Sequence, residues 1–183
     1  MSLTAFRTLL ATATLGILLG GCGLTQRVMD GGSAIAHEVF YKQVKVLHLD
    51  FNARAALNTA STDMSGMSVS TLVRVYQLKD RKTLDSADYQ SLLSDGDGVL
   101  AADLLDTRRV VVKPDEGAQL NVPMADDAKF VAVVALFRSP DTQKDNWRLV
   151  LPREELDPDQ PRVIELGDNQ LSVLPLQKKD SWW

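Results

Sequence analysis

The sequence predicts an antiparallel β-sandwich that carries a small helical insertion. About seven or eight short segments alternate apolar and polar residues, which is the period of a half-buried strand. Clusters of Gly, Pro, Asn and Asp separate these segments, and one stretch with helical spacing lies between the second and the third. The composition, 45% hydrophobic and 24% charged over 183 residues, is that of a folded domain, which disfavours a fibre or a disordered chain.

The strands are expected over 44–51, 69–79, 108–113, 119–123, 129–138, 146–152, 161–167 and 170–176. The first alternates, with Leu47, Leu49 and Phe51 on one face and His48 on the other. The run 129–138 is continuous and apolar on both faces. The Gly-Asp-Asn at 167–169 stands between two alternating runs and predicts a hairpin.

The helical insertion is expected over about 84–106. Asp85 or Ser86 is the candidate N-cap, and Leu92 and Leu93 follow at helical spacing. The "DGDG" at 95–98 predicts a turn that ends this helix, because it lacks the third acid and the closing glutamate of a calcium loop. The segment 99–106 is expected to form a second short helix.

The first 22 residues have the three-part layout of a secretory signal. A short start carries one positive charge, Arg7, an apolar run of about a dozen residues follows, and small residues precede Cys22. The run is shorter than the roughly 20 apolar residues that span a bilayer. A cleavable signal is therefore expected.

Cys22 is the only cysteine, and a lone cysteine can be a buried hydrophobe, a reactive thiolate, a metal ligand or a lipid attachment site. The run Leu19, Gly20, Gly21 and Cys22 resembles the bacterial lipobox, which implies lipidation of Cys22 after cleavage of the signal. The alternative is an ordinary signal with a cysteine nearby by chance. Gly23, in place of the aspartate associated with inner-membrane retention, implies the outer membrane, facing the periplasm.

Three parts are expected along the chain. They are a lipoprotein signal peptide over 1–21, the lipidated cysteine with a polar tether over 22–42, and the β-sandwich domain over 43–183. The Trp182–Trp183 pair at the C-terminus either covers a sandwich edge or offers a partner an apolar tail.

The residues do not favour catalysis, a metal or a nucleic-acid partner. A net charge of −4 and a pI near 5.1 lack the basic footprint of a nucleic-acid binder. His37 and His48 have no second ligand at zinc spacing, and His48 fits a packed sheet residue better than a metal ligand. The sequence contains no nucleophile elbow, P-loop or dinucleotide motif. We therefore predict no enzyme, no cofactor and no metal.

One ordered set of stretches runs from "ALN" (56–58) to "WR" (147–148). Between them stand Gly66, "STLVRVYQLKD" (70–80), "SADYQSLL" (86–93), "LAADLL" (100–105), "VVVKPDEGA" (110–118) and "FVAVVALFR" (130–138). Together they resemble the TssJ (SciN) family, the outer-membrane lipoproteins of the bacterial type VI secretion system. The chain departs from the family pattern at Ser70–Thr71, where a proline is usual, and at Ala132, where a glycine is usual.

The resemblance implies a transthyretin-like β-sandwich with extra helices and a structural role. It also implies binding to the periplasmic C-terminal domain of the inner-membrane protein TssM, within a TssL-containing membrane complex. The family makes that contact through the loop between the first two strands, here 52–68. The expected partner-binding residues are Asn52, Ala53, Arg54, Leu57, Asn58, Asp63, Met64, Gly66 and Met67.

Apolar residues in this polar loop suit an interface, because buried anchors within a polar rim carry most binding energy. For Leu57 the alternative is that it pins the loop to the sandwich. A different function, a periplasmic lipoprotein that binds a sugar or a peptide, would need clustered aromatic and polar groups. Aromatic residues make up only 6% of the chain.

Overall fold

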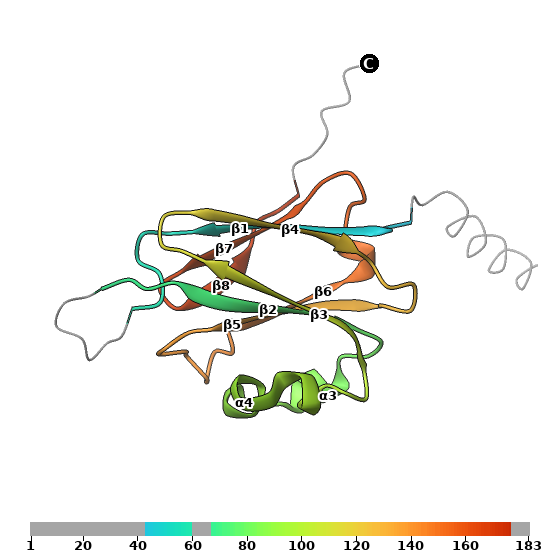
Figure 1. Cartoon of the computed structure of the whole chain (residues 1–183), viewed down its shortest axis with the longest axis horizontal. Coiled ribbons are helices and arrows are strands. Elements are labelled where there is room, and N and C mark those ends of the chain that lie inside the picture. Colours follow the sequence, from blue (N-terminus) through green and yellow to red (C-terminus); the bar gives the residue numbers. More distant parts are fainter. Residues whose placement is uncertain (1–42, 60–66, 177–183) are drawn as a thin grey trace, which may run out of the picture. The chain divides into compact units, whose positions relative to one another are not determined.

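Two four-stranded sheets face each other, and a helical layer covers the outer side of the second (Figure 1). This is a computed structural model, which describes residues 43–59 and 67–176. The first sheet has the order β4-β1-β7-β8 and the second the order β3-β2-β5-β6. The predicted β-sandwich is confirmed, and so is the helical insertion between the second and third strands.

Each predicted strand segment overlaps one strand of the structure. The elements are β1 (Val46–Ala53), β2 (Thr71–Leu78), α3 (Lys82–Ser86), α4 (Tyr89–Val99), β3 (Leu104–Val112), β4 (Gly117–Pro123), β5 (Phe130–Leu136), β6 (Arg148–Pro152), η1 (Arg153–Glu155), β7 (Arg162–Gly167) and β8 (Gln170–Val173).

The core lies between the two sheets. Leu47, Leu49 and Phe51 of β1 are buried, as their alternation predicts, whereas Asn52 is exposed. In β5 all of 131–135 is buried, because one face of the strand meets the first sheet and the other meets the helices. This double covering explains why the run 129–138 is apolar on both faces.

Two arginines tie the helical layer to the second sheet. Arg74 of β2 donates from Nη1 to the Leu92 carbonyl oxygen at 2.6 Å. Arg148 of β6 donates from Nη1 to the carbonyl oxygens of Leu84 at 2.6 Å and Ala87 at 2.8 Å. Leu84 and Ala87 lie at the C-terminal end of α3, and Leu92 lies just before an interruption of α4 at Asp95. Carbonyl groups at such ends are short of intrahelical donors, so the guanidinium groups add hydrogen bonds there while packing the helices onto the strands.

The helical insertion differs from the prediction in three ways. The N-cap of α4 is Asp88, whose carboxylate accepts from the Ser91 amide at 2.8 Å, and neither Asp85 nor Ser86 takes that role. The "DGDG" does not end the helix, because α4 continues to Val99 across an interruption at Asp95 (φ −149°, ψ 68°). The predicted second helix over 99–106 is wrong, since Leu104 begins β3 and pairs with Leu78.

One strand pair departs from a purely antiparallel arrangement. Strand β7 runs parallel to β1, with Asp50 opposite Val163, and the chain reaches β7 from β6 of the second sheet through η1. The predicted hairpin between β7 and β8 is present, with Gly167 opposite Gln170. Asp168 and Asn169 form its turn with positive φ values of 51° and 59°, as a two-residue hairpin turn requires.

Over residues 43–59 and 67–176, no helix is both long and apolar enough to cross a membrane.

Gly96 allows α4 to lie directly on β2, and replacing it should destabilise the fold. A Cβ at Gly96 would overlap the hydroxyl of Tyr76, whose ring is fully buried and cannot retreat. Overpacking of this kind costs about 1–3 kcal/mol, so Gly96→Ala is expected to lower the free energy of unfolding by about that amount in a denaturant titration.

Gly117→Ala is the matched control. A Cβ there would meet the Phe51 carbonyl oxygen at 3.5 Å, an ordinary contact, so stability should stay within about 0.5 kcal/mol of wild type. Equal stability of the two variants would show that Tyr76 does not limit the approach of α4.

Candidate protein-binding loop

The start of the β1–β2 loop is braced against two neighbouring segments at one end of the sandwich. The Ala53 amide donates to the Glu116 carbonyl oxygen at 3.1 Å, and the Arg54 amide donates to that of Leu166 at 2.8 Å. The Asp168 amide in turn donates to the Ala56 carbonyl oxygen at 2.9 Å. The β3–β4 turn and the β7–β8 hairpin therefore hold the start of the loop. Asn52 and Ala53, predicted to lie in the loop, end β1 instead.

Asn58 fixes the middle of the described loop. It is 3% exposed and has a positive φ of 51°, which Asn tolerates better than most residues. Its Nδ2 donates to the Ser70 carbonyl oxygen at 3.2 Å, and its Oδ1 accepts from the Arg138 amide at 2.7 Å. One side chain thus joins the loop to the residue before β2 and to the segment after β5.

Leu57 is fully buried and belongs to the hydrophobic core. Its carbonyl oxygen accepts from the Val69 amide at 3.2 Å, so the two ends of the loop meet beside it. This position matches the alternative in which Leu57 pins the loop to the sandwich. Leu57 and Asn58 shape the loop from inside and offer little surface to a partner.

The β7–β8 turn supports the loop from the side. Asn169 donates from Nδ2 to the Thr59 carbonyl oxygen at 2.8 Å. Arg54 forms ion pairs with Glu165 and, at 3.8 Å, with Asp168, and its methylene groups lie where a side chain on Gly167 would otherwise stand. The sequence identified this turn but gave no signal of its contact with the loop, because more than 100 residues separate Thr59 from Asn169.

Three of the predicted partner-binding residues offer substantial surface. Met67 is 63% exposed, the Arg54 side chain is 59% exposed, and Asn52 at the end of β1 is exposed as well. Asp63, Met64 and Gly66 lie outside the described residues, as does Cys22, so their roles stay predictions. The structure therefore brings Arg54, Leu57, Asn58 and Met67 into one loop, but divides them into supporting and exposed residues.

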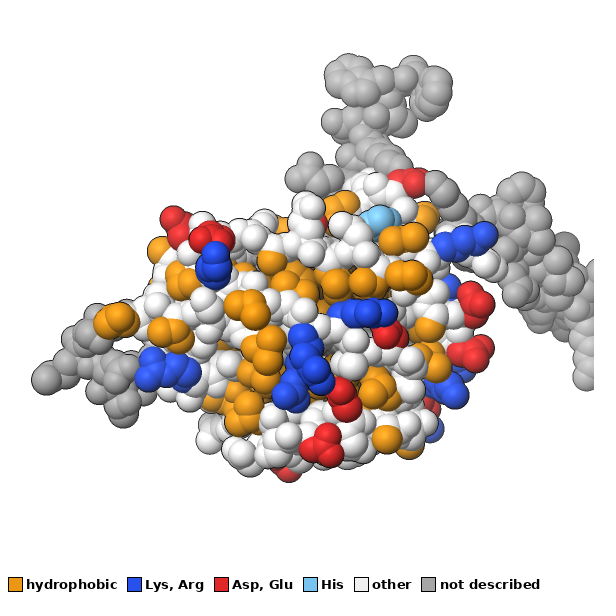
Figure 2. Space-filling view, viewed as in Figure 1, with side chains coloured by type: hydrophobic (Ala, Val, Ile, Leu, Met, Phe, Trp, Pro, Cys, Tyr) orange, Lys and Arg blue, Asp and Glu red, His pale blue; other side chains and the backbone are white. Residues whose placement is uncertain are grey.

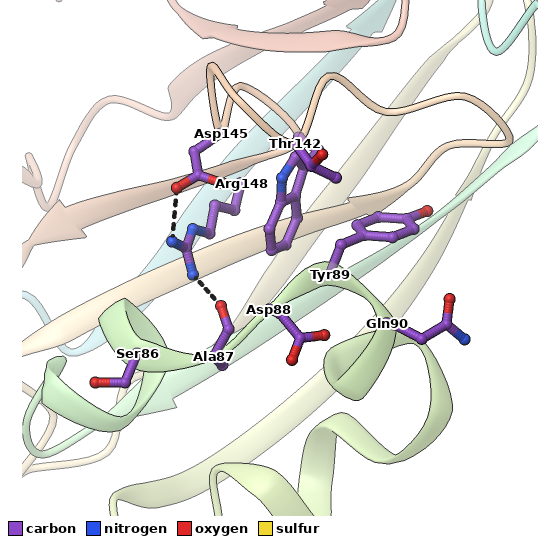
Figure 3. A pocket seen from close by; sticks show the side chains of 9 residues that line it. Ser86, Ala87, Asp88, Tyr89, Gln90, Thr142, Asp145 and Arg148 are labelled. Carbon is purple, nitrogen blue, oxygen red and sulfur yellow. Dashed lines mark hydrogen bonds and ion pairs between the residues drawn. The ribbon is translucent and has the colours of Figure 1, made fainter.

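A hollow of about 500 Å³ lies elsewhere, between the helical layer and the β5–β6 connection. Tyr89, Trp147 and Arg148 line it, together with Asp88 and Asp145 (Figure 3). The rings of Tyr89 and Trp147 meet edge to face with centroids 5.0 Å apart, and the guanidinium carbon of Arg148 lies 4.9 Å from the Trp147 ring centroid. Such a hollow is the feature that a small-ligand function would need.

The charged groups of this hollow are already engaged within the chain. Figure 3 shows Arg148 between Asp145, which accepts at 2.9 Å, and the Ala87 carbonyl. Asp88 caps α4, and burial raises the pKa of the Tyr89 hydroxyl, which donates to the Phe137 carbonyl oxygen. The hollow therefore fits a structural joint better than a ligand site.

In the described part of the chain, no cluster of three or more His, Cys, Asp or Glu could hold a metal. His48 is a half-buried residue on the outer face of the first sheet, where Nδ1 contacts Asn121 Oδ1 at 2.5 Å. This is the packed sheet position that its sequence context predicts.

Replacing Asn58 should loosen the loop. Asn58→Ala removes both hydrogen bonds, leaves the Ser70 carbonyl and the Arg138 amide to find other partners, and places alanine at a positive φ. We expect a loss of about 2–4 kcal/mol in the free energy of unfolding. Asn58→Gly removes the same bonds without the backbone penalty and should be more stable than the alanine variant by about 1 kcal/mol. Unfolding titrations would check both values, and a glycine variant less stable than the alanine one would contradict this account.

The comparisons with known proteins identify one family. The family model described as "Type VI secretion lipoprotein, VasD, EvfM, TssJ, VC_A0113" matches residues 45–169. A chain from a solved structure described as "T6SS protein TssM C-terminal domain (869-1107) from EAEC" is 43% identical, with a TM-score of 0.66, and the match covers 73% of this chain and 100% of that one. A chain from a structure described as "Type VI membrane complex" is 45% identical, with a TM-score of 0.68 and the same coverage.

A more distant structure shares the fold. Lip from Serratia marcescens, described as a membrane bound component of the type VI secretion system, is 24% identical with a TM-score of 0.62, over 72% of this chain and 98% of that one. A search of curated proteins finds no match. Since the family model spans more than half of the sequence, the chain belongs to the type VI secretion lipoprotein family of TssJ, VasD and EvfM.

Proposed function

We propose that this chain helps assemble the type VI secretion membrane complex by binding the periplasmic C-terminal domain of a TssM-like inner-membrane protein. A lipid on Cys22 anchors it to the outer membrane on the periplasmic side, and the TssM-like protein connects it to a TssL-containing complex in the inner membrane. The role is structural and needs no catalysis.

The observation that carries the proposal is the 43% identity to a chain from the structure that names the TssM C-terminal domain. The domain named there runs over residues 869–1107, more residues than this whole chain, yet 73% of this chain covers the matched chain completely. We infer that the matched chain accompanies the TssM domain in that structure. The match to a chain from the type VI membrane complex supports the same assembly.

The β1–β2 loop supports the proposal physically. Its backbone is tied to the β3–β4 turn, the β7–β8 hairpin and the end of β5 before any partner arrives. The described residues of the loop are thus held in place before binding, so they lose little conformational entropy on binding, and this raises affinity. Met67 supplies an exposed apolar side chain at its far end, and methionine adapts its shape to a partner.

Binding should depend on the exposed part of the loop. We expect the full chain, purified in detergent, to bind the periplasmic C-terminal domain of the TssM-like protein from the same genome in a calorimetric titration. Met67→Glu should weaken this binding by about tenfold or more, because it places a charge where the partner would bury an apolar side chain. A point change is preferable to a loop deletion, since removing Leu57 and Asn58 would disturb the core.

Val46→Glu is the matched control for this titration. Val46 is 39% exposed on the outer face of the first sheet, away from the loop, and its replacement should leave affinity unchanged. No saturable binding by the folded wild-type chain would overturn the partner assignment and direct attention to the small-ligand alternative and the hollow beside Trp147.

Lipidation should decide where the protein resides without affecting its fold. The described sandwich begins at residue 43 and draws its core from later residues, so Cys22→Ser should give the same circular dichroism spectrum and the same partner affinity. The variant should be absent from the outer-membrane fraction of a density gradient. It lacks the thiol that carries the proposed lipid, and acyl chains are what hold such a protein on the membrane. Its retention there would contradict anchoring through Cys22.

A further inference from the structure

A row of apolar side chains crosses the outer face of the second sheet beside the helices. Leu72 of β2 pairs with Val111 of β3 on one side and with Leu136 of β5 on the other. Val111 is 59% exposed, and Leu72 and Leu136 are half-buried. The neighbouring row, two residues further along β2, contains Arg74, which bonds to α4. The helical layer therefore covers one part of this face and leaves the adjacent row open.

Two further exposed apolar residues lie beside this row. Leu93 of α4 is 36% exposed, and its carbonyl oxygen accepts from Arg74 at 3.3 Å, which places it over the row of Arg74, the neighbouring row on the same face. Met67 precedes Leu72 by five residues, so the two cannot lie more than about 18 Å apart. Figure 2 shows hydrophobic side chains gathered from beside the β1–β2 loop across to the helices. Met67, Leu93 and Val111 are three of the five large hydrophobic residues that are exposed in the described ranges.

A specific protein–protein interface is larger than the surface that the described β1–β2 loop provides. Specific complexes bury about 800 Å² on each partner, from roughly 20–30 residues. The described loop places Leu57 and Asn58 inside the protein, and Met67 is its one large exposed hydrophobic residue in the described ranges. A partner seated on Met67 must therefore cover neighbouring surface as well, and the row around Val111 is the apolar surface that adjoins the exit of the loop into β2.

The charges around the row indicate what kind of partner surface fits it. Arg109 of β3 lies on the same face as Val111 and is paired with Asp97 of α4 at 3.1 Å, and Lys113, just after β3, is paired with Glu116 at 3.3 Å. The surroundings are thus close to neutral and select neither an acidic nor a basic partner. An apolar patch with a polar rim is the complement that such a surface favours.

We propose that the row Val111–Leu72–Leu136, with Leu93, forms the second half of the surface that binds the TssM-like periplasmic domain, and that it receives an apolar patch of that domain. This inference rests on the proposed function, because it assigns the same partner to a larger surface. The β1–β2 loop supplies one side of the contact, and the outer face of the second sheet supplies the other.

The test compares charged and neutral changes at Val111 in the full chain, by calorimetry against the same periplasmic domain. Val111→Glu and Val111→Lys should each weaken binding by about tenfold or more, since either charge would be desolvated against an apolar patch. Val111→Thr keeps the β-branched shape and should weaken binding by a smaller factor of about three. Val111→Ile and the Val46→Glu control should bind as wild type does. Thermal melts of every variant show whether the fold is kept. If a charged variant unfolds, the affinity of the Val111→Thr variant tests the proposal in its place.

Each outcome separates the two proposals. If the wild-type chain binds and Met67→Glu weakens binding while all Val111 variants bind normally, the extended surface is wrong and the loop assignment stands. If Val46→Glu loses as much affinity as Val111→Glu, the effect is not local and the extended surface is again overturned. Equal affinity loss for Glu and Lys at Val111 supports an apolar partner patch, whereas loss with only one sign of charge would overturn that chemistry. If the wild-type chain does not bind, the partner assignment itself fails.

Discussion

The helical layer depends on two arginines that lie in one cross-strand row. Arg74 of β2 and Arg148 of β6 flank Val134 of β5 in register, so all three side chains leave the same face of the second sheet. A buried guanidinium is costly unless hydrogen-bond acceptors surround it, and here the carbonyl groups near the ends of α3 and of the first part of α4 supply them. A cation also suits the negative end of a helix. Because the helices are held in this way, β5 can be apolar on both faces, and the second sheet becomes a buried layer.

The described part of the β1–β2 loop is held in a different way. Asn58, Asp168 and Asn169 all have positive φ values, which small polar residues tolerate because their side chains bond to nearby backbone. Asn58 and Asn169 also use their side chains to hold the loop, through Ser70, Arg138 and Thr59. Conformational strain and hydrogen bonding thus coincide at the same residues.

Local patterns predicted the strands well, because side chains alternate between the two faces of a strand whichever strands it pairs with. They failed at 99–106, where alanine and leucine favour a helix but pairing of Leu104 with Leu78 on β2 decides for a strand. They also failed at Asp95. The glycines of 95–98 predict a turn there, but α4 continues to Val99, and Gly96 packs against Tyr76 of β2. For the candidate site, the loop was identified by resemblance, but the burial of Leu57 and the support from the β7–β8 turn depend on contacts between distant segments. Such contacts leave no periodic signal in a single sequence.

The position of the helices also determines which part of the second sheet stays open. The row of Arg74 is covered because its guanidinium reaches the carbonyl groups of Leu92 and Leu93. The row of Leu72, two residues nearer to the β1–β2 loop, has no such donor, and Val111 in it is 59% exposed. A polar residue would be the usual choice on an uncovered outer face, and β1 of the first sheet follows this rule with His48, Asp50 and Asn52, although Val46 is exposed there. The row next to the loop differs because apolar side chains follow one another across three paired strands, and a contiguous apolar surface of this kind is the feature from which we propose a partner that covers it together with the loop.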